Sequence, residues 1–105
     1  MDVIAQRLLM VSRDGRQEEI RIQIGRPQLF RGTDYSCAYQ ITGAGVSKVK
    51  YAVGTDAIQA LQLVMPMIGV DLATLNAAFD SSIRWPSGEP LDGHLGFPIT
   101  VEKTA

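Results

Sequence analysis

The chain has a single cysteine and a single histidine, Cys37 and His94, among its 105 residues. One cysteine cannot form an internal disulfide, and the two side chains together fall short of the three or four ligands of a zinc site. No nucleophile motif such as G-x-S-x-G accompanies His94. We predict no catalytic residue, no metal site and no cofactor, with Cys37 in the core and His94 in a structural loop. The sequence leans away from an enzyme without excluding one, because catalytic groups can converge from distant positions.

The chain also lacks an excess of positive charge and a long uninterrupted apolar run. Its net charge is -1, which argues against a nucleic-acid binder whose affinity comes mainly from bulk positive charge. The longest apolar run, LVMPMIGV, has about eight residues and is too short to span a bilayer. The N-terminus shows no cationic start followed by an apolar segment, as a signal peptide would. We therefore expect no nucleic-acid partner, no membrane association and a cytoplasmic location.

Alternation of apolar and polar residues predicts strands in the first half of the chain. Ile20, Ile22 and Ile24, for example, alternate with charged and polar residues. The glycine and proline before residue 28 end one strand, so residues 28–34 are expected to form a loop with its apolar side chains under the sheet edge. The predicted strands are residues 3–12, 17–25, 35–42 and 46–53.

The first hairpin admits two registers. A two-residue Asp14-Gly15 turn pairs Leu9 with Ile20, whereas a three-residue loop pairs Leu8 with Ile20. The second register gathers more apolar side chains opposite the isoleucines, and the buried face normally decides register. We predict the three-residue loop.

The last predicted strand, 46–53, has a clear alternation of its own. Val49, Tyr51 and Val53 share one face, and Lys48 and Lys50 share the other. We expect the three large apolar side chains to point inward and the lysines to point to solvent.

Helical spacing begins after this strand. Asp56 with a glutamine three residues later has capping-box spacing, and a predominantly apolar segment follows. The segment predicts a helix over about 56–68, which Pro66 should kink or end. Residues 71–80 either continue this helix or form a second one capped by Asp71.

Residues 81–101 contain many glycines and prolines but also several large apolar side chains, so we predict an ordered tail that packs back on the body. The whole chain, 1–105, is predicted to be one α+β domain. It consists of an antiparallel meander of about four strands, with a kinked helical segment on one face and the tail returning beside it.

The helical segment has more apolar surface than one sheet face requires, and large exposed apolar patches mark interaction sites. We predict a non-enzymatic interaction or regulatory module that forms a homodimer or binds an unidentified protein. The predicted interface consists of Leu61, Val64, Met65, Met67 and Ile68.

Two alternatives remain open. One is a small-ligand-binding protein with a pocket between sheet and helix. Its predicted lining is Tyr35, Tyr39, Tyr51 and Trp85. The other is an immunity-type partner of a toxin.

Three segments, DYSCAYQI, GTDAIQALQL and LGFP, give the chain a family resemblance. Over about Ala5 to Pro98 it resembles a family of small bacterial proteins known only as a domain of unknown function. The resemblance implies a compact stand-alone domain of bacterial, cytoplasmic origin. It implies no activity, cofactor or catalytic residue.

Overall fold

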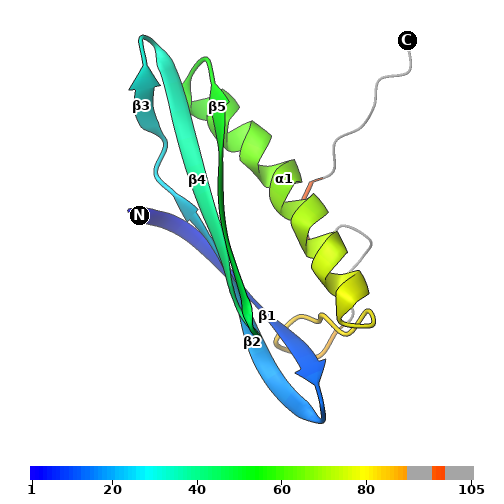
Figure 1. Cartoon of the computed structure of the whole chain (residues 1–105). Helices are drawn as coiled ribbons and strands as arrows, with labels where there is room; N and C mark the ends of the chain where they lie inside the picture. The colour runs from blue at the N-terminus through cyan, green and yellow to red at the C-terminus, as the bar shows by residue number, and fades with distance from the viewer. Residues whose placement is uncertain (90–95, 99–105) are drawn as a thin grey trace, which may run out of the picture.

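The described residues form one antiparallel sheet with one helix on one of its faces (Figure 1). This computed structural model describes residues 1–89 and 96–98. The predicted α+β class and the meander-like strand order are confirmed. His94 and part of the predicted tail lie outside the described residues. The elements are β1 (Val3–Arg13), β2 (Arg16–Gly25), β3 (Gln28–Arg31), β4 (Asp34–Gly43), β5 (Val46–Gly54) and α1 (Ala57–Ala78).

The sheet is four strands wide, because β2 and β3 lie one after the other along the same edge of β4. β2 pairs with residues 39–42 of β4, β3 pairs with residues 34–36, and β5 pairs along the whole opposite edge. The predicted loop over residues 28–34 was therefore wrong in its first half. Pro27 interrupts the ladder only briefly, and the chain resumes pairing as β3. Leu29 and Phe30 are exposed rather than tucked under the sheet.

The first hairpin has the register that the sequence argument rejected. Asp14 and Gly15 both have positive φ, 50° and 75°, which gives the two-residue turn typical of tight hairpins. Leu9 consequently pairs with Ile20, and both side chains are fully buried.

The rejected register was disfavoured because it places Arg7 on the buried face, opposite Ile22. The structure accommodates Arg7 by stacking. Its guanidinium lies 4.9 Å from the ring centroids of both Trp85 and Phe97. The returning tail thus covers the stem of this arginine and keeps its charge near the surface.

The face assignment of β5 was also wrong. The two-residue turn at Ala44-Gly45 sets Lys50 opposite Tyr39, and cross-strand partners share a face. Because Tyr39 is in the core, Lys50 points toward the helix and Tyr51 points to the uncovered face.

α1 is one continuous helix through Pro66, so of the two open alternatives residues 71–78 continue the helix and do not form a second one capped by Asp71. The Asp56 cap is confirmed, because its carboxylate accepts the Gln59 N–H at 2.7 Å. Pro66 lacks the N–H that would bond the carbonyl of residue 62, and because Gln62 is exposed, water can bond this carbonyl instead.

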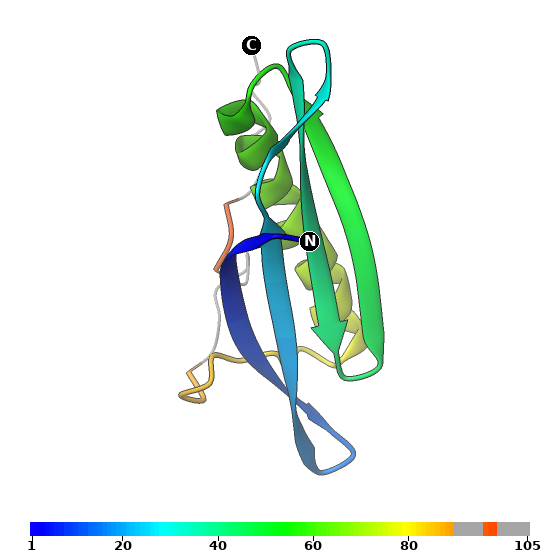
Figure 2. The same cartoon turned by 90° about the vertical axis from the view of Figure 1, so that its left-hand side faces the viewer.

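The core lies between α1 and the covered face of the sheet (Figure 2). The helix contributes a buried stripe at helical spacing, and the strands contribute alternate residues. The stripe consists of Ala60, Val64, Ile68, Gly69, Asp71, Leu72 and Leu75. The opposite face of the sheet carries no second layer among the described residues (Figure 2).

α1 is long and apolar enough to cross a membrane, judged by length and composition alone. It has 22 residues, and its most apolar window has a mean hydropathy of 1.5. The uninterrupted apolar run of about eight residues underestimates the length of this apolar helix, because isolated polar residues interrupt the run without ending the helix. The core helix of a compact domain has the same properties, and α1 packs one stripe on the sheet as such a helix does.

Candidate interaction groove

A groove of about 430 Å³ opens between α1 and β5, the strand at one edge of the sheet. The strand side presents Lys50 and Ala52. The helix side is apolar, with Leu63 and Val70 exposed at 42% and 64%. The full lining is Tyr39, Lys50, Ala52, Val53, Leu63, Pro66, Met67, Val70 and Asp71.

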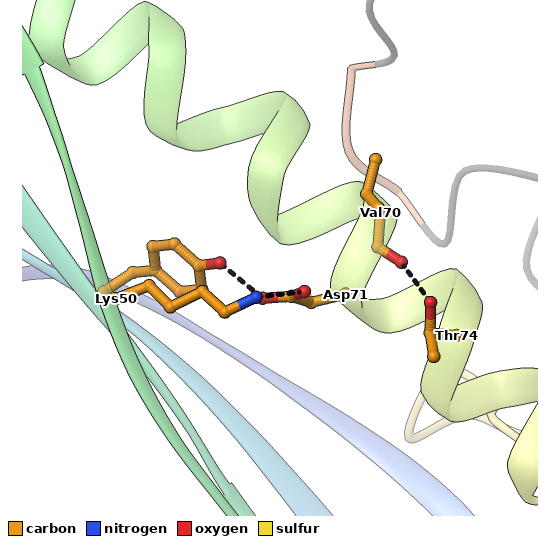
Figure 3. Close-up of polar contacts among 5 residues, drawn as sticks. Lys50, Val70, Asp71 and Thr74 are labelled. Carbon is orange, nitrogen blue, oxygen red and sulfur yellow. Dashed lines mark hydrogen bonds and ion pairs between the residues drawn. The ribbon is translucent and has the colours of Figure 1, made fainter.

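Asp71 forms the polar floor of this groove (Figure 3). It lies in the buried stripe of α1, and Tyr39 of β4 donates a short hydrogen bond to one of its carboxylate oxygens. Lys50 of β5 reaches across the groove and places its Nζ 2.9 Å from the other oxygen. Three elements are therefore tied together at one carboxylate.

The charge of Asp71 is maintained by its partners. Burial alone raises the pKa of this carboxyl, but the hydrogen bonds from Tyr39 and Lys50 and the charges of Lys50 and Lys48 more than offset it, so the pKa is lowered. Tyr39 shows the converse: burial, and then its bond to the carboxylate, raise the pKa of the phenol well above its ordinary value. At neutral pH the groove floor holds an ionised carboxylate and a neutral phenol.

This arrangement holds the helix on the sheet. Each carboxylate oxygen of Asp71 accepts a hydrogen bond, one from β4 and one from β5. In the described parts of the chain, no three His, Cys, Asp or Glu side chains gather where a metal ion could bind.

The outer edge of β5 is the second component of the site. The residues that flank a two-residue turn form a hydrogen-bonded pair, and such pairs alternate along the strand. The peptide groups that bond to β4 are therefore those of the inward-facing residues. The peptide groups of Ser47, Val49, Tyr51 and Val53 point away from the sheet, and no described strand pairs with them.

Apolar side chains flank this edge on both faces of the sheet. On the uncovered face, Val49 is 64% and Tyr51 59% exposed, and the ring of Phe30 lies 6.4 Å from that of Tyr51. On the groove face, Leu63 and Val70 of α1 are exposed. An edge strand with free peptide groups thus lies between two apolar surfaces.

The predicted interface on the helix was partly misplaced. Val64 and Ile68 are fully buried against the sheet of their own chain and cannot contact a partner. Leu61, Met65 and Met67 are half-buried against the core, and of these Met67 lines the groove. The missed side chains are Ile58, Leu63 and Val70.

The predicted ligand pocket is not formed. Tyr39 lines the groove, but Tyr51 is on the opposite face of the sheet and Trp85 stacks on Arg7 beside β1. Tyr35 is half-buried at the far end of β4.

The sequence did not reveal Lys50 and Asp71 as the polar members of the site. A signal was present for Asp71, which follows Val64 by seven residues and Ile68 by three. That spacing places it on the buried stripe of a continuous helix.

Cys37 is a buried core residue, as predicted. Its Sγ lies 3.4 Å from the carbonyl oxygen of Gly25, and burial raises the pKa of the thiol. A thiol in this setting is poorly reactive.

The chain belongs to the family described as a domain of unknown function (DUF6968), whose model matches residues 5–99. The predicted resemblance to an uncharacterised family is confirmed. Comparison with curated proteins gave no match, and comparison with solved structures gave none either.

Proposed function

We propose that this member of the DUF6968 family is a non-enzymatic protein-interaction module that accepts an extended strand of a partner along the free edge of β5. The observation that carries the proposal is the pair of apolar surfaces on either side of that edge. Main-chain hydrogen bonds to the edge supply affinity in this mode of binding, and pockets for alternate side chains supply specificity.

An added strand needs apolar contacts on both faces, because its side chains point alternately up and down. Here one set would lie beside Val49 and Tyr51, and the other would enter the groove beside Leu63 and Val70. An exposed apolar patch on one face alone would favour a helix or a flat surface as partner. The Asp71 cluster supports this role by fixing α1 at the distance from β5 that leaves the groove open.

The test blocks the edge without disturbing the fold. Val49→Pro removes one outward-pointing N–H, and proline is tolerated at such a position of an edge strand. Val49→Thr keeps the N–H and the branched shape and is the matched control. A displayed library of random peptides is selected on the immobilised protein, and oligomeric state is measured by sedimentation.

The proposal predicts either selected peptides of alternating apolar pattern or a self-associated protein. In both cases Val49→Pro should weaken binding at least about tenfold, because the incoming strand loses one main-chain hydrogen bond and meets the proline ring in its place. Val49→Thr should leave binding unchanged. A protein that is monomeric and selects no peptide, or one whose peptides bind Val49→Pro normally, would refute it.

The earlier alternatives stay predictions of lower rank. A small ligand could enter the groove, but only one of the four predicted lining residues, Tyr39, is there. A toxin-binding, immunity-type role is one case of the same interaction class, and no described residue singles out a toxin. Bacterial origin and a cytoplasmic location also stay predictions.

A further inference from the structure

We infer that the strand which occupies this edge is β5 of a second copy of the chain, related by a two-fold axis that passes beside Tyr51. The inference rests on the proposed function and names its partner. In the resulting dimer, the two sheets join into one continuous sheet, and both helices lie on the same face of it.

The register follows from which peptide groups are free. Only Ser47, Val49, Tyr51 and Val53 can bond outward, so antiparallel pairing of two β5 strands must match members of this set. With Tyr51 opposite its own copy, Val49 faces Val53 of the second copy on the uncovered face. Pairs of β-branched or aromatic side chains of this kind stabilise neighbouring strands.

On the groove face, the same register places each lysine opposite a small residue. Lys50 faces Ala52 of the second copy, and Lys48 faces Gly54. Sliding the pairing by one allowed step in one direction places Lys50 opposite its own copy, and a further step places Lys48 opposite Lys50. Like charges directly opposite one another are destabilising. A step in the other direction brings Ala52 opposite its copy but shortens the paired segment.

The position of the helices agrees with this arrangement. α1 packs over both β4 and β5. With neighbouring strands about 4.8 Å apart, the boundary between β4 and β5 lies about one strand spacing from the two-fold axis, so the two helices would be roughly 10 Å apart. That is the usual distance of packed helices. The exposed Leu63 and Val70 would then be covered by the second helix.

Lysines on the covered face of an edge strand often serve to prevent such pairing. In this chain the carboxylate of Asp71 offsets part of their charge. Lys50 is ion-paired with Asp71 at 2.9 Å, and Lys48 is close enough to lower the pKa of the same carboxyl. The groove face of β5 therefore does not present two free positive charges to the incoming strand.

Single cysteine substitutions test the partner and the register together. A residue opposite its own copy lies about 5.5 Å away between Cα atoms, within disulfide range. We expect Tyr51→Cys to form a covalent dimer under mild oxidation of the folded protein. Val49→Cys is the matched control, because its copy would be four residues away along the strand, roughly 13 Å. Wild type, whose one cysteine is buried, should stay uncrosslinked.

Each outcome decides between the hypotheses. A sedimenting dimer with crosslinking at Tyr51→Cys alone supports the inference. Crosslinking at Val49→Cys or Val53→Cys instead overturns the register. A monomer at all concentrations that selects library peptides, and loses them on Val49→Pro, overturns the second copy as partner and leaves the proposed function standing. A monomer that selects no peptide overturns both.

Discussion

Replacing Asp71 by alanine should reveal what holds α1 on the sheet. The change leaves the hydroxyl of Tyr39 without its partner inside the core, and hydrogen bonds to a charged acceptor are worth about 1.5–3 kcal/mol. The ion pair with Lys50 adds at most about 1 kcal/mol, because the Lys50 side chain is 47% exposed and screened by water. We expect Asp71→Ala to lower the free energy of unfolding by about 3 kcal/mol.

Three further variants separate the contributions of Tyr39 and Lys50 to this loss of stability. Asp71→Asn keeps an oxygen for the Tyr39 hydroxyl and should lose only about 1 kcal/mol. Lys50→Met keeps the stem that lines the groove and removes the charge, and should lose no more than about 1 kcal/mol. Tyr39→Phe should lose about 2 kcal/mol, because the buried carboxylate then keeps a single hydrogen-bond partner.

Urea unfolding, followed by circular dichroism, measures these differences. With a slope of about 1 kcal/mol per molar urea for a chain of this size, Asp71→Ala should lower the midpoint by roughly 3 M. The reasoning would be refuted by a Lys50→Met variant that loses as much stability as Asp71→Ala. It would also be refuted by an Asp71→Ala variant as stable as wild type.

Three other predictions follow from the same structure. The pKa of Asp71 is lower in the folded chain than its ordinary value of 3.8, so its contribution to stability is complete above that value and is lost as the pH falls through the folded pKa. The stability difference between wild type and Asp71→Asn should therefore shrink in acid unfolding titrations. The pKa of Tyr39 is raised above its ordinary value of 10.0, so its contribution is complete below pH 10 and is lost at higher pH. While the protein stays folded near pH 10, Tyr39→Phe should show the same phenolate absorbance as wild type, and a lower absorbance would contradict this. Gly54→Ala should lower the melting temperature, because the added Cβ would lie 2.5 Å from the backbone nitrogen of Ala60 in the first turn of α1. Gly15→Ala is the control, because it also replaces a glycine by alanine but its Cβ would meet open space. Its effect on the melting temperature should come from the positive φ of this position alone.

The strands and the helix could be predicted from the sequence because each has a clear apolar period. The buried faces of β2 and β4 could be predicted in the same way, but those of β1 and β5 could not, because Arg7 and Lys50 lie on the covered face of the sheet. Arg7 faces the core side because Trp85 and Phe97, about 80 or more residues away in sequence, cover its stem. Lys50 faces inward because it forms an ion pair with Asp71 of the helix. Local periodicity alone does not predict either contact, the one that Arg7 makes with the tail or the one that Lys50 makes with the helix.

The candidate site was predicted in part for a related reason. A helix that is apolar on nearly all sides does not show which stripe the sheet will cover, so Val64 and Ile68 were assigned to an interface that they cannot form. The polar residue on the buried stripe, Asp71, was the discriminating feature. Pro66 left two alternatives open, a continued helix or a second helix capped by Asp71, so the sequence did not decide whether Asp71 lies on the stripe. The exposed Leu63 and Val70 follow once the stripe is fixed.

The order of elements along the chain has a consequence during synthesis. In the part of the chain that the structure describes, all five strands precede α1, so the helix that covers the sheet is made after them. Hairpins form in about 1–10 μs, whereas a ribosome adding roughly 5–20 residues per second needs seconds to progress from the end of β2 to the end of α1. During that interval the first hairpin presents its isoleucine-rich face, Ile20, Ile22 and Ile24, without cover. The nascent chain thus passes through a period in which an apolar strand face is exposed, and exposed apolar surface of this kind favours aggregation.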